Sequence, residues 1–156
     1  MPLLRAALSW NFVLATAICA SLLAQLIKVL LNLFIFHRFI AERMWGAGGM
    51  PSSHSATVCA MVVATGRYCG VNSPIFAIAA VLSIIVMYDA MGVRYETGEQ
   101  ANVLNKMLEQ WIEVTEKNNP FLQNMHLKEM VGHTPLQVMA GFALGILVGF
   151  LYPMGL

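Results

Sequence analysis

Long apolar runs alternate with short polar segments along the chain, and a transmembrane helix needs about 20 mostly apolar residues. Three runs reach or approach that length: Leu8 to Phe36, Ser73 to Met91 and Leu136 to Tyr152. A fourth, His54 to Tyr68, is shorter, but its Ala56, Ala60 and Ala64 recur every four residues and suit close helix packing. The pattern predicts an all-α, polytopic membrane helix bundle with about four transmembrane helices.

The longest polar segment lies between the third and fourth runs and has a helical period of its own. Between Gln100 and Lys117 the apolar residues recur at three- and four-residue spacing; they are Val103, Leu104, Met107, Leu108, Trp111 and Ile112. This stripe predicts an amphipathic helix that Asn118 to Pro120 terminate. We expect it to lie along the membrane surface or to pack on the bundle. Residues 1–156 are predicted to form a single membrane-embedded domain.

Composition supports a membrane protein and excludes an ordinary soluble domain. The chain has 58% hydrophobic and 11% charged residues, with a net charge of +1. We therefore expect it to contact the bilayer and not nucleic acid.

The polar residues with reactive side chains cluster at one end of the predicted bundle. Four spans alternate in direction, so the end of the first, the start of the second, the end of the third and the start of the fourth share one face. The residues at these positions are Lys28, Arg38, Arg43, Ser52, Ser53, His54, Asp89, Arg94, Glu99, Lys128 and His133.

Basic residues are unevenly divided between the two predicted membrane faces. Arg38, Arg43, Arg94, Lys106, Lys117 and Lys128 fall on the reactive side, whereas Arg5 and Arg67 fall on the other and Lys28 lies within a span. By the positive-inside bias this predicts a multi-pass protein of the cell membrane whose reactive face is cytoplasmic.

Histidines among lysines and arginines at a water–lipid boundary indicate phosphoryl transfer from a lipid. Cations neutralise the phosphoryl oxygens, one imidazole attacks phosphorus, and another protonates the leaving oxygen. This chemistry requires no metal and no cofactor. Ser52 and the backbone around Gly48 and Gly49 can add donors at a helix N-terminus, which favours anions.

Two stretches carry a family resemblance. "MPSSHS" resembles the Pro-Ser-Gly-His signature of the type 2 phosphatidic acid phosphatase superfamily, to which vanadium haloperoxidases also belong, with Ser53 in place of the glycine. "GHTPLQVMAG", Gly132 to Gly141, resembles the end of that superfamily's third signature. With "DAMGVR" and "GEQANVLN" between them, the chain is most similar to the small divergent bacterial and plastid branch.

The resemblance implies an acid phosphatase-like lipid phosphate phosphohydrolase. Its substrate would be phosphatidate, phosphatidylglycerol phosphate or a polyprenyl diphosphate. It makes His133 the nucleophile, His54 the general acid, and Ser52, Ser53 and Lys28 phosphate-binding residues. Ile35 and Leu127 stand where the superfamily has arginines, so Arg38 or Arg43 and Lys128 or Arg94 are the substitutes. Because the superfamily typically has six spans, a homo-oligomer is expected to complete the wall of the bundle.

The main departure from the superfamily is Gln137, which stands where an aspartate orients the nucleophilic histidine. A neutral amide holds a tautomer but does not stabilise imidazolium as a carboxylate does. We therefore expect Asp89 or Glu99 to lie within hydrogen-bond reach of His133.

Each residue also has a plainer interpretation. Ser52 can be a helix N-cap, Lys28 can extend to the headgroups, Arg38 and Arg43 can set topology, and Asp89 can pair with Arg94. Two rival functions follow: a non-catalytic membrane protein that binds anionic lipid or a partner, and a metal-dependent hydrolase in which Asp89, Glu96 and Glu99 hold a divalent cation.

Overall fold

The computed structural model describes residues 11–36, 49–114, 126–127 and 132–154, and within these ranges all regular structure is helical. The helices are α2 (Phe12–Phe36), α4 (Ser53–Cys69), α5 (Pro74–Met91), α6 (Val93–Val114) and α8 (Pro135–Leu151). The predicted all-α fold is confirmed, and each predicted apolar run forms a helix. Helix α8 is apolar but shorter than the two described segments that are long and apolar enough to cross a membrane, Phe12–Phe34 and Pro74–Ile112.

Helix α4 lies at the centre of the bundle and packs against α2, α5 and α8. Its Ala56 and Ala60 meet Ala20 and Ala24 of α2, and all four side chains are fully buried. The predicted role of small residues in close helix packing is confirmed, since the chain of α4 has no large side chain on this face.

Three glycines of α8 allow its backbone to approach α4 directly. A Cβ atom at Gly145 would lie 2.5 Å from the carbonyl oxygen of Ala56, one at Gly149 would lie 2.6 Å from Cβ of Val63, and one at Gly141 would collide with the carbonyl oxygen of Ser52. Any side chain at these positions would push the helices apart. This approach brings the N-termini of α4 and α8 together, and the Ser52 N–H donates to the Gln137 carbonyl at 3.0 Å.

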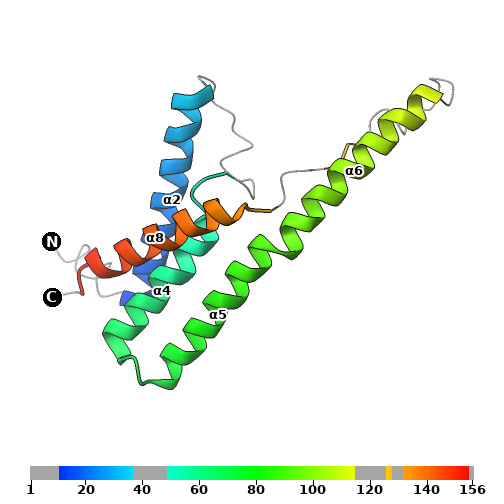
Figure 1. Ribbon diagram of the computed structural model, residues 1–156. Helices are drawn as coiled ribbons and strands as arrows, with labels where there is room; N and C mark the ends of the chain where they lie inside the picture. Colours follow the sequence, from blue (N-terminus) through cyan, green and yellow to red (C-terminus); the bar gives the residue numbers. More distant parts are fainter. Residues whose placement is uncertain (1–10, 37–48, 115–125, 128–131, 155–156) are drawn as a thin grey trace.

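Helices α5 and α6 follow one another along a long rod that extends beyond the bundle (Figure 1). The amphipathic helix begins at Val93, seven residues before the predicted Gln100, because the polar residues after Gly92 continue as helix. Four residues of its apolar stripe remain exposed: Val103, Leu104, Met107 and Trp111. The stripe therefore does not pack on the described part of the bundle, and its location along the membrane surface stays a prediction.

Candidate active site

Two histidines meet where the N-termini of α4 and α8 converge. The rings of His54 and His133 lie 6.1 Å apart between centroids, in an edge-to-face arrangement. His54 is the second residue of α4 and is exposed, whereas His133 comes directly before the N-cap of α8 and is 2% exposed. The two histidines that the sequence pattern selected are therefore brought together from positions 79 residues apart in the chain.

The end of α5 holds the backbone of His133. Its N–H donates to the carbonyl oxygen of Ala90 at 3.1 Å. Thr134 then caps α8, and its side chain and that of Gln137 form a reciprocal capping box with the backbone. The turn that carries His133 is thus fixed on one side by α5 and on the other by the first turn of α8.

Gln137 also determines how the imidazole of His133 presents its two nitrogens. Nδ1 of His133 lies 3.1 Å from Oε1 of Gln137, and the same oxygen accepts from the Thr134 N–H at 3.3 Å. Because an amide oxygen only accepts, Nδ1 carries the proton and donates it. Nε2 is then the unprotonated nitrogen, and it is buried with no hydrogen-bond partner among the described residues.

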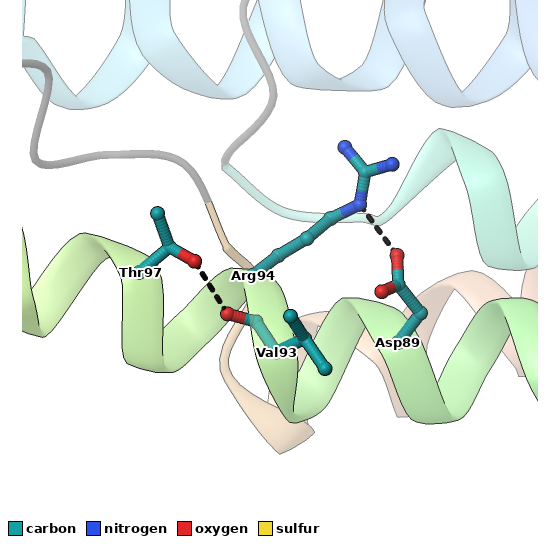
Figure 2. Close-up of polar contacts among 4 residues, drawn as sticks. All are labelled: Asp89, Val93, Arg94 and Thr97. Atoms are coloured by element: carbon teal, nitrogen blue, oxygen red, sulfur yellow. Dashed lines mark hydrogen bonds and ion pairs between the residues drawn. The ribbon is translucent and has the colours of Figure 1, made fainter.

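The expectation that a carboxylate supports His133 is wrong. Asp89 instead forms an ion pair with Arg94, with Nε to Oδ2 at 2.6 Å, and Figure 2 shows the carboxylate facing this nitrogen. Glu99 is exposed on α6 and makes no described contact with His133. The physical reason is distance along the helices: Arg94, five residues after Asp89, reaches back to it, while Gln137, one turn after His133, fills the position beside Nδ1.

Lys28 is buried within the apolar bundle, at 2% exposure. Its methylene chain passes under the turn at Gly49, where a Cβ atom would lie 3.3 Å from Cδ of Lys28, and the φ of +85° at Gly49 also favours glycine. Among the described residues no carboxylate pairs with Lys28. A buried ammonium group without a counter-ion is unfavourable, so this position is suited to an anionic ligand.

Charge around His133 is positive. Burial lowers the pKa of His133 below the ordinary value for histidine; the bond to Gln137 opposes this shift, and the nearby Lys28, His54 and Arg94 add to it. At neutral pH the imidazole of His133 is consequently uncharged, and its Nε2 lone pair is available. The terminal nitrogens of Arg94 point away from Asp89 (Figure 2), so the ion pair does not occupy the whole guanidinium group.

Ser52 and Ser53 line the start of α4 with their hydroxyl groups engaged. Oγ of Ser52 accepts from the N–H of Ser55 at 3.4 Å and from its hydroxyl at 3.1 Å, so the N-cap interpretation is confirmed. Both bonds use Ser52 as an acceptor, which leaves its own proton to donate. Ser53 accepts from Nε2 of Gln25 at 3.4 Å.

Sequence analysis missed Gln25, whose Oε1 is buried without a hydrogen-bond partner in the described ranges. The available signal was a polar side chain in an apolar span, three residues before Lys28 and so on the same helix face. Arg38, Arg43 and Lys128 lie outside the described residues, and their predicted contacts with substrate stay predictions.

The metal-dependent alternative finds no support in the described ranges. No group of three or more His, Cys, Asp or Glu side chains there is arranged to hold a metal ion. Asp89, the centre of that alternative, is instead bonded to Arg94.

Comparison with known proteins agrees with these features. Residues 9–148 match the divergent PAP2 family, which is most of the chain. The chain belongs to this family. It is also 35% identical over 144 residues to the uncharacterized membrane protein YuiD of Bacillus subtilis (strain 168), which covers 88% of this chain and 91% of YuiD. No solved structure matches the chain.

Membership of the divergent PAP2 family confirms the resemblance seen in "GGMPSSHSA" and "GHTPLQV". The relative's name and the apolar helices identify the chain as a helical membrane protein. Within the family match lie His54, His133, Lys28 and Gln137, the residues that converge at the candidate site.

Proposed function

We propose that this protein is an integral-membrane lipid phosphatase that acts through a phosphohistidine at His133. The observation that carries the proposal is the environment of this residue. Nδ1 is bonded to Gln137, Nε2 has no partner in the part of the chain that the structure describes, and His54 and the cations Lys28 and Arg94 are nearby. A nucleophile, an acid and a counter-charge for phosphate are the components that phosphoryl transfer needs.

In the first step Nε2 of His133 attacks phosphorus, and the bond from phosphorus to the lipid oxygen breaks. Burial, Arg94 and Lys28 lower the pKa of His54, and Asp89 opposes this shift. The protonated form of His54 gives its proton to that oxygen, so the dephosphorylated lipid leaves neutral at this atom. Lys28 and Arg94 attract the phosphoryl oxygens, as do the helix N-termini that meet at Ser52 and Gln137. In the second step His54 takes a proton from water, whose oxygen attacks the phosphohistidine and releases inorganic phosphate and free His133.

The substrate would be a lipid phosphomonoester or diphosphate, such as phosphatidate, phosphatidylglycerol phosphate or a polyprenyl diphosphate. Its headgroup would reach the site from the bilayer plane, since Lys28 lies within an apolar helix. We further propose that the chain spans the cell membrane several times with this face in the cytoplasm. A homo-oligomer would complete the lipid-facing wall, on which many large apolar side chains of α2, α5 and α8 are exposed.

A panel assay tests the proposal. Purified protein is incubated with each lipid phosphate, with and without chelator, and with vanadate, which mimics the phosphoryl transition state. We expect release of inorganic phosphate from at least one lipid, inhibition by vanadate and no effect of the chelator. Absence of turnover for every lipid would contradict the proposal.

One observation favours a second function, the non-catalytic binding of anionic lipid. The imidazolium that forms during attack has only the neutral amide of Gln137 beside it, and no described carboxylate contacts His133. A binding protein would bind vanadate or lipid phosphates at Lys28 and release no phosphate. The same panel separates the two, because binding and turnover are measured on one preparation.

A further inference from the structure

Helix α6 turns a face of small and polar residues inward, toward the side opposite its exposed apolar stripe. Gly98, Ala101 and Asn105 are buried and follow one another at three- and four-residue spacing, which places them on one face. All three belong to the stretch "GEQANVLN", to which the proposed mechanism gives no role. A buried asparagine requires hydrogen-bond partners, so its contacts show what this face holds.

Asn105 binds both backbone groups of a single residue, Leu127. Its Nδ2 donates to the Leu127 carbonyl at 2.9 Å, and the Leu127 N–H donates to its Oδ1 at 2.9 Å. Nδ1 of His126 also lies 3.0 Å from that carbonyl. These two bonds fix both the position and the orientation of the Leu127 backbone on α6, because one uses its N–H and the other its carbonyl oxygen.

A second contact with the same rod lies just before His133. A Cβ atom at Gly132 would collide with the backbone of Tyr95 and would come within 2.6 Å of the carbonyl carbon of Arg94. The next N–H, that of His133, donates to Ala90. Leu127 is therefore held by Asn105, Gly132 lies against the start of α6, and His133 is held by the end of α5.

The contact at Leu127 and the contact at Gly132 are close enough along the chain for one to restrain the other. Tyr95 and Asn105 are ten residues apart on a continuous helix, a rise of roughly 15 Å. Leu127 and Gly132 are five residues apart, and a chain extends at most about 3.6 Å per residue, or roughly 18 Å in all. Release of Leu127 from Asn105 would therefore remove a restraint on Gly132 and His133.

We propose that Asn105 is a positioning residue. Its two hydrogen bonds to the Leu127 backbone restrain the chain that leads to His133 and so help to place His133 at the candidate site. The catalytic part of this inference rests on the proposed function. A misplacement of a reacting group by about 1 Å can cost roughly a hundredfold in rate, so we expect Asn105→Ala to lower kcat by roughly tenfold to a hundredfold. KM should change less than kcat, because the described bonds of Asn105 to Leu127 are to its backbone.

Hydrogen exchange of the purified full-length protein, resolved to single amides by mass spectrometry, tests the coupling without reference to activity. Asn105→Ala is compared with Asn102→Ala, a matched change one turn earlier whose side chain has no described bond. We expect faster exchange at the Leu127 and His133 amides in Asn105→Ala only, with α4 and α8 still protected. Asn105→Asp, which keeps the acceptor for the Leu127 N–H, should restore much of the protection.

Faster exchange at Leu127 alone, or unchanged kcat in an Asn105→Ala protein whose His133 amide is exposed, would overturn the inference. If the wild-type protein hydrolyses no lipid phosphate, the proposed function fails, and the exchange of the His133 amide still decides whether Asn105 positions this segment.

Discussion

Replacing Gln137 by Glu would place a carboxylate beside Nδ1 of His133, where the structure has a neutral amide. The two side chains have the same length, so a glutamate oxygen can take the place of Oε1, 3.1 Å from Nδ1. Gln137 is half-buried and lies in the first turn of α8. A carboxylate there is compatible with the capping box and with the helix dipole, and the fold should tolerate it.

The size of the effect follows from the change in hydrogen bond. A neutral bond contributes about 0.5–1.5 kcal/mol and a bond to a charged group about 1.5–3 kcal/mol. The gain of about 1–1.5 kcal/mol applies when His133 becomes positive during attack, and about 1.4 kcal/mol corresponds to tenfold in rate. We therefore expect Gln137→Glu to raise kcat by roughly fivefold to tenfold. Asp, which is one methylene shorter, should help less, and Leu, which cannot accept, should lower kcat.

The pH dependence of kcat/KM tests the Gln137→Glu substitution independently of the size of kcat. In the wild type burial lowers the pKa of His133, so the nucleophile stays neutral below the ordinary histidine value and activity falls only as pH drops through the lowered pKa. The new carboxylate favours imidazolium, so the acid limb of kcat/KM should move to higher pH in Gln137→Glu. A folded variant with unchanged kcat and an unmoved acid limb would refute the assignment of His133 as the nucleophile supported by residue 137.

Further predictions concern the acid, the buried cation, the helix interface and the topology. His54→Ala should lower kcat by at least about a hundredfold at an unchanged melting temperature, and near-normal turnover would remove His54 from the mechanism. Lys28→Met should abolish vanadate binding yet leave the melting temperature equal or higher, since it removes a buried charge that no described carboxylate pairs with; marked destabilisation would assign Lys28 a structural role. Gly145→Ala should destabilise by about 1–3 kcal/mol through its collision with α4. Gly66→Ala, whose Cβ would meet side chains and not backbone, the ring edge of Phe76 at 3.1 Å and Cγ1 of Val71 at 3.6 Å, should cost much less; equal effects would contradict the packing argument. Cys69 is exposed at the end of α4 remote from His54, so a membrane-impermeant thiol reagent should label it in intact cells but not label Cys69→Ser, and protection would place the reactive face outside.

The helices could be predicted because their signals are local. Apolar runs gave α2, α5 and α8 to within a few residues, and Ser52 before "SHS" marked the start of α4. The clustering of His54, His133 and Lys28 followed from alternating span direction alone. The start of α6 was missed because the polar residues after Gly92 carry no apolar period, although they continue the helix.

The partner of His133 could not be predicted in the same way. Asp89 and Gln137 are both near enough in the chain topology, and the choice depends on where each side chain points. Arg94 binds Asp89 at 2.6 Å, and the capping box directs Gln137 back over its own N-terminus toward His133. Such pairings depend on side-chain geometry between helices, which hydrophobic periodicity does not encode.

The central claim is that phosphate passes through Nε2 of His133, and trapping of the intermediate tests it most directly. The protein is quenched in alkali during turnover of a lipid phosphate, digested, and analysed by mass spectrometry for phosphohistidine, with His133→Asn and His54→Ala in parallel. We predict phosphate on the peptide that contains His133, none in His133→Asn, and accumulation in His54→Ala when the lipid has a good leaving group. Sustained turnover in His133→Asn, or phosphate on His54 alone, would contradict the account.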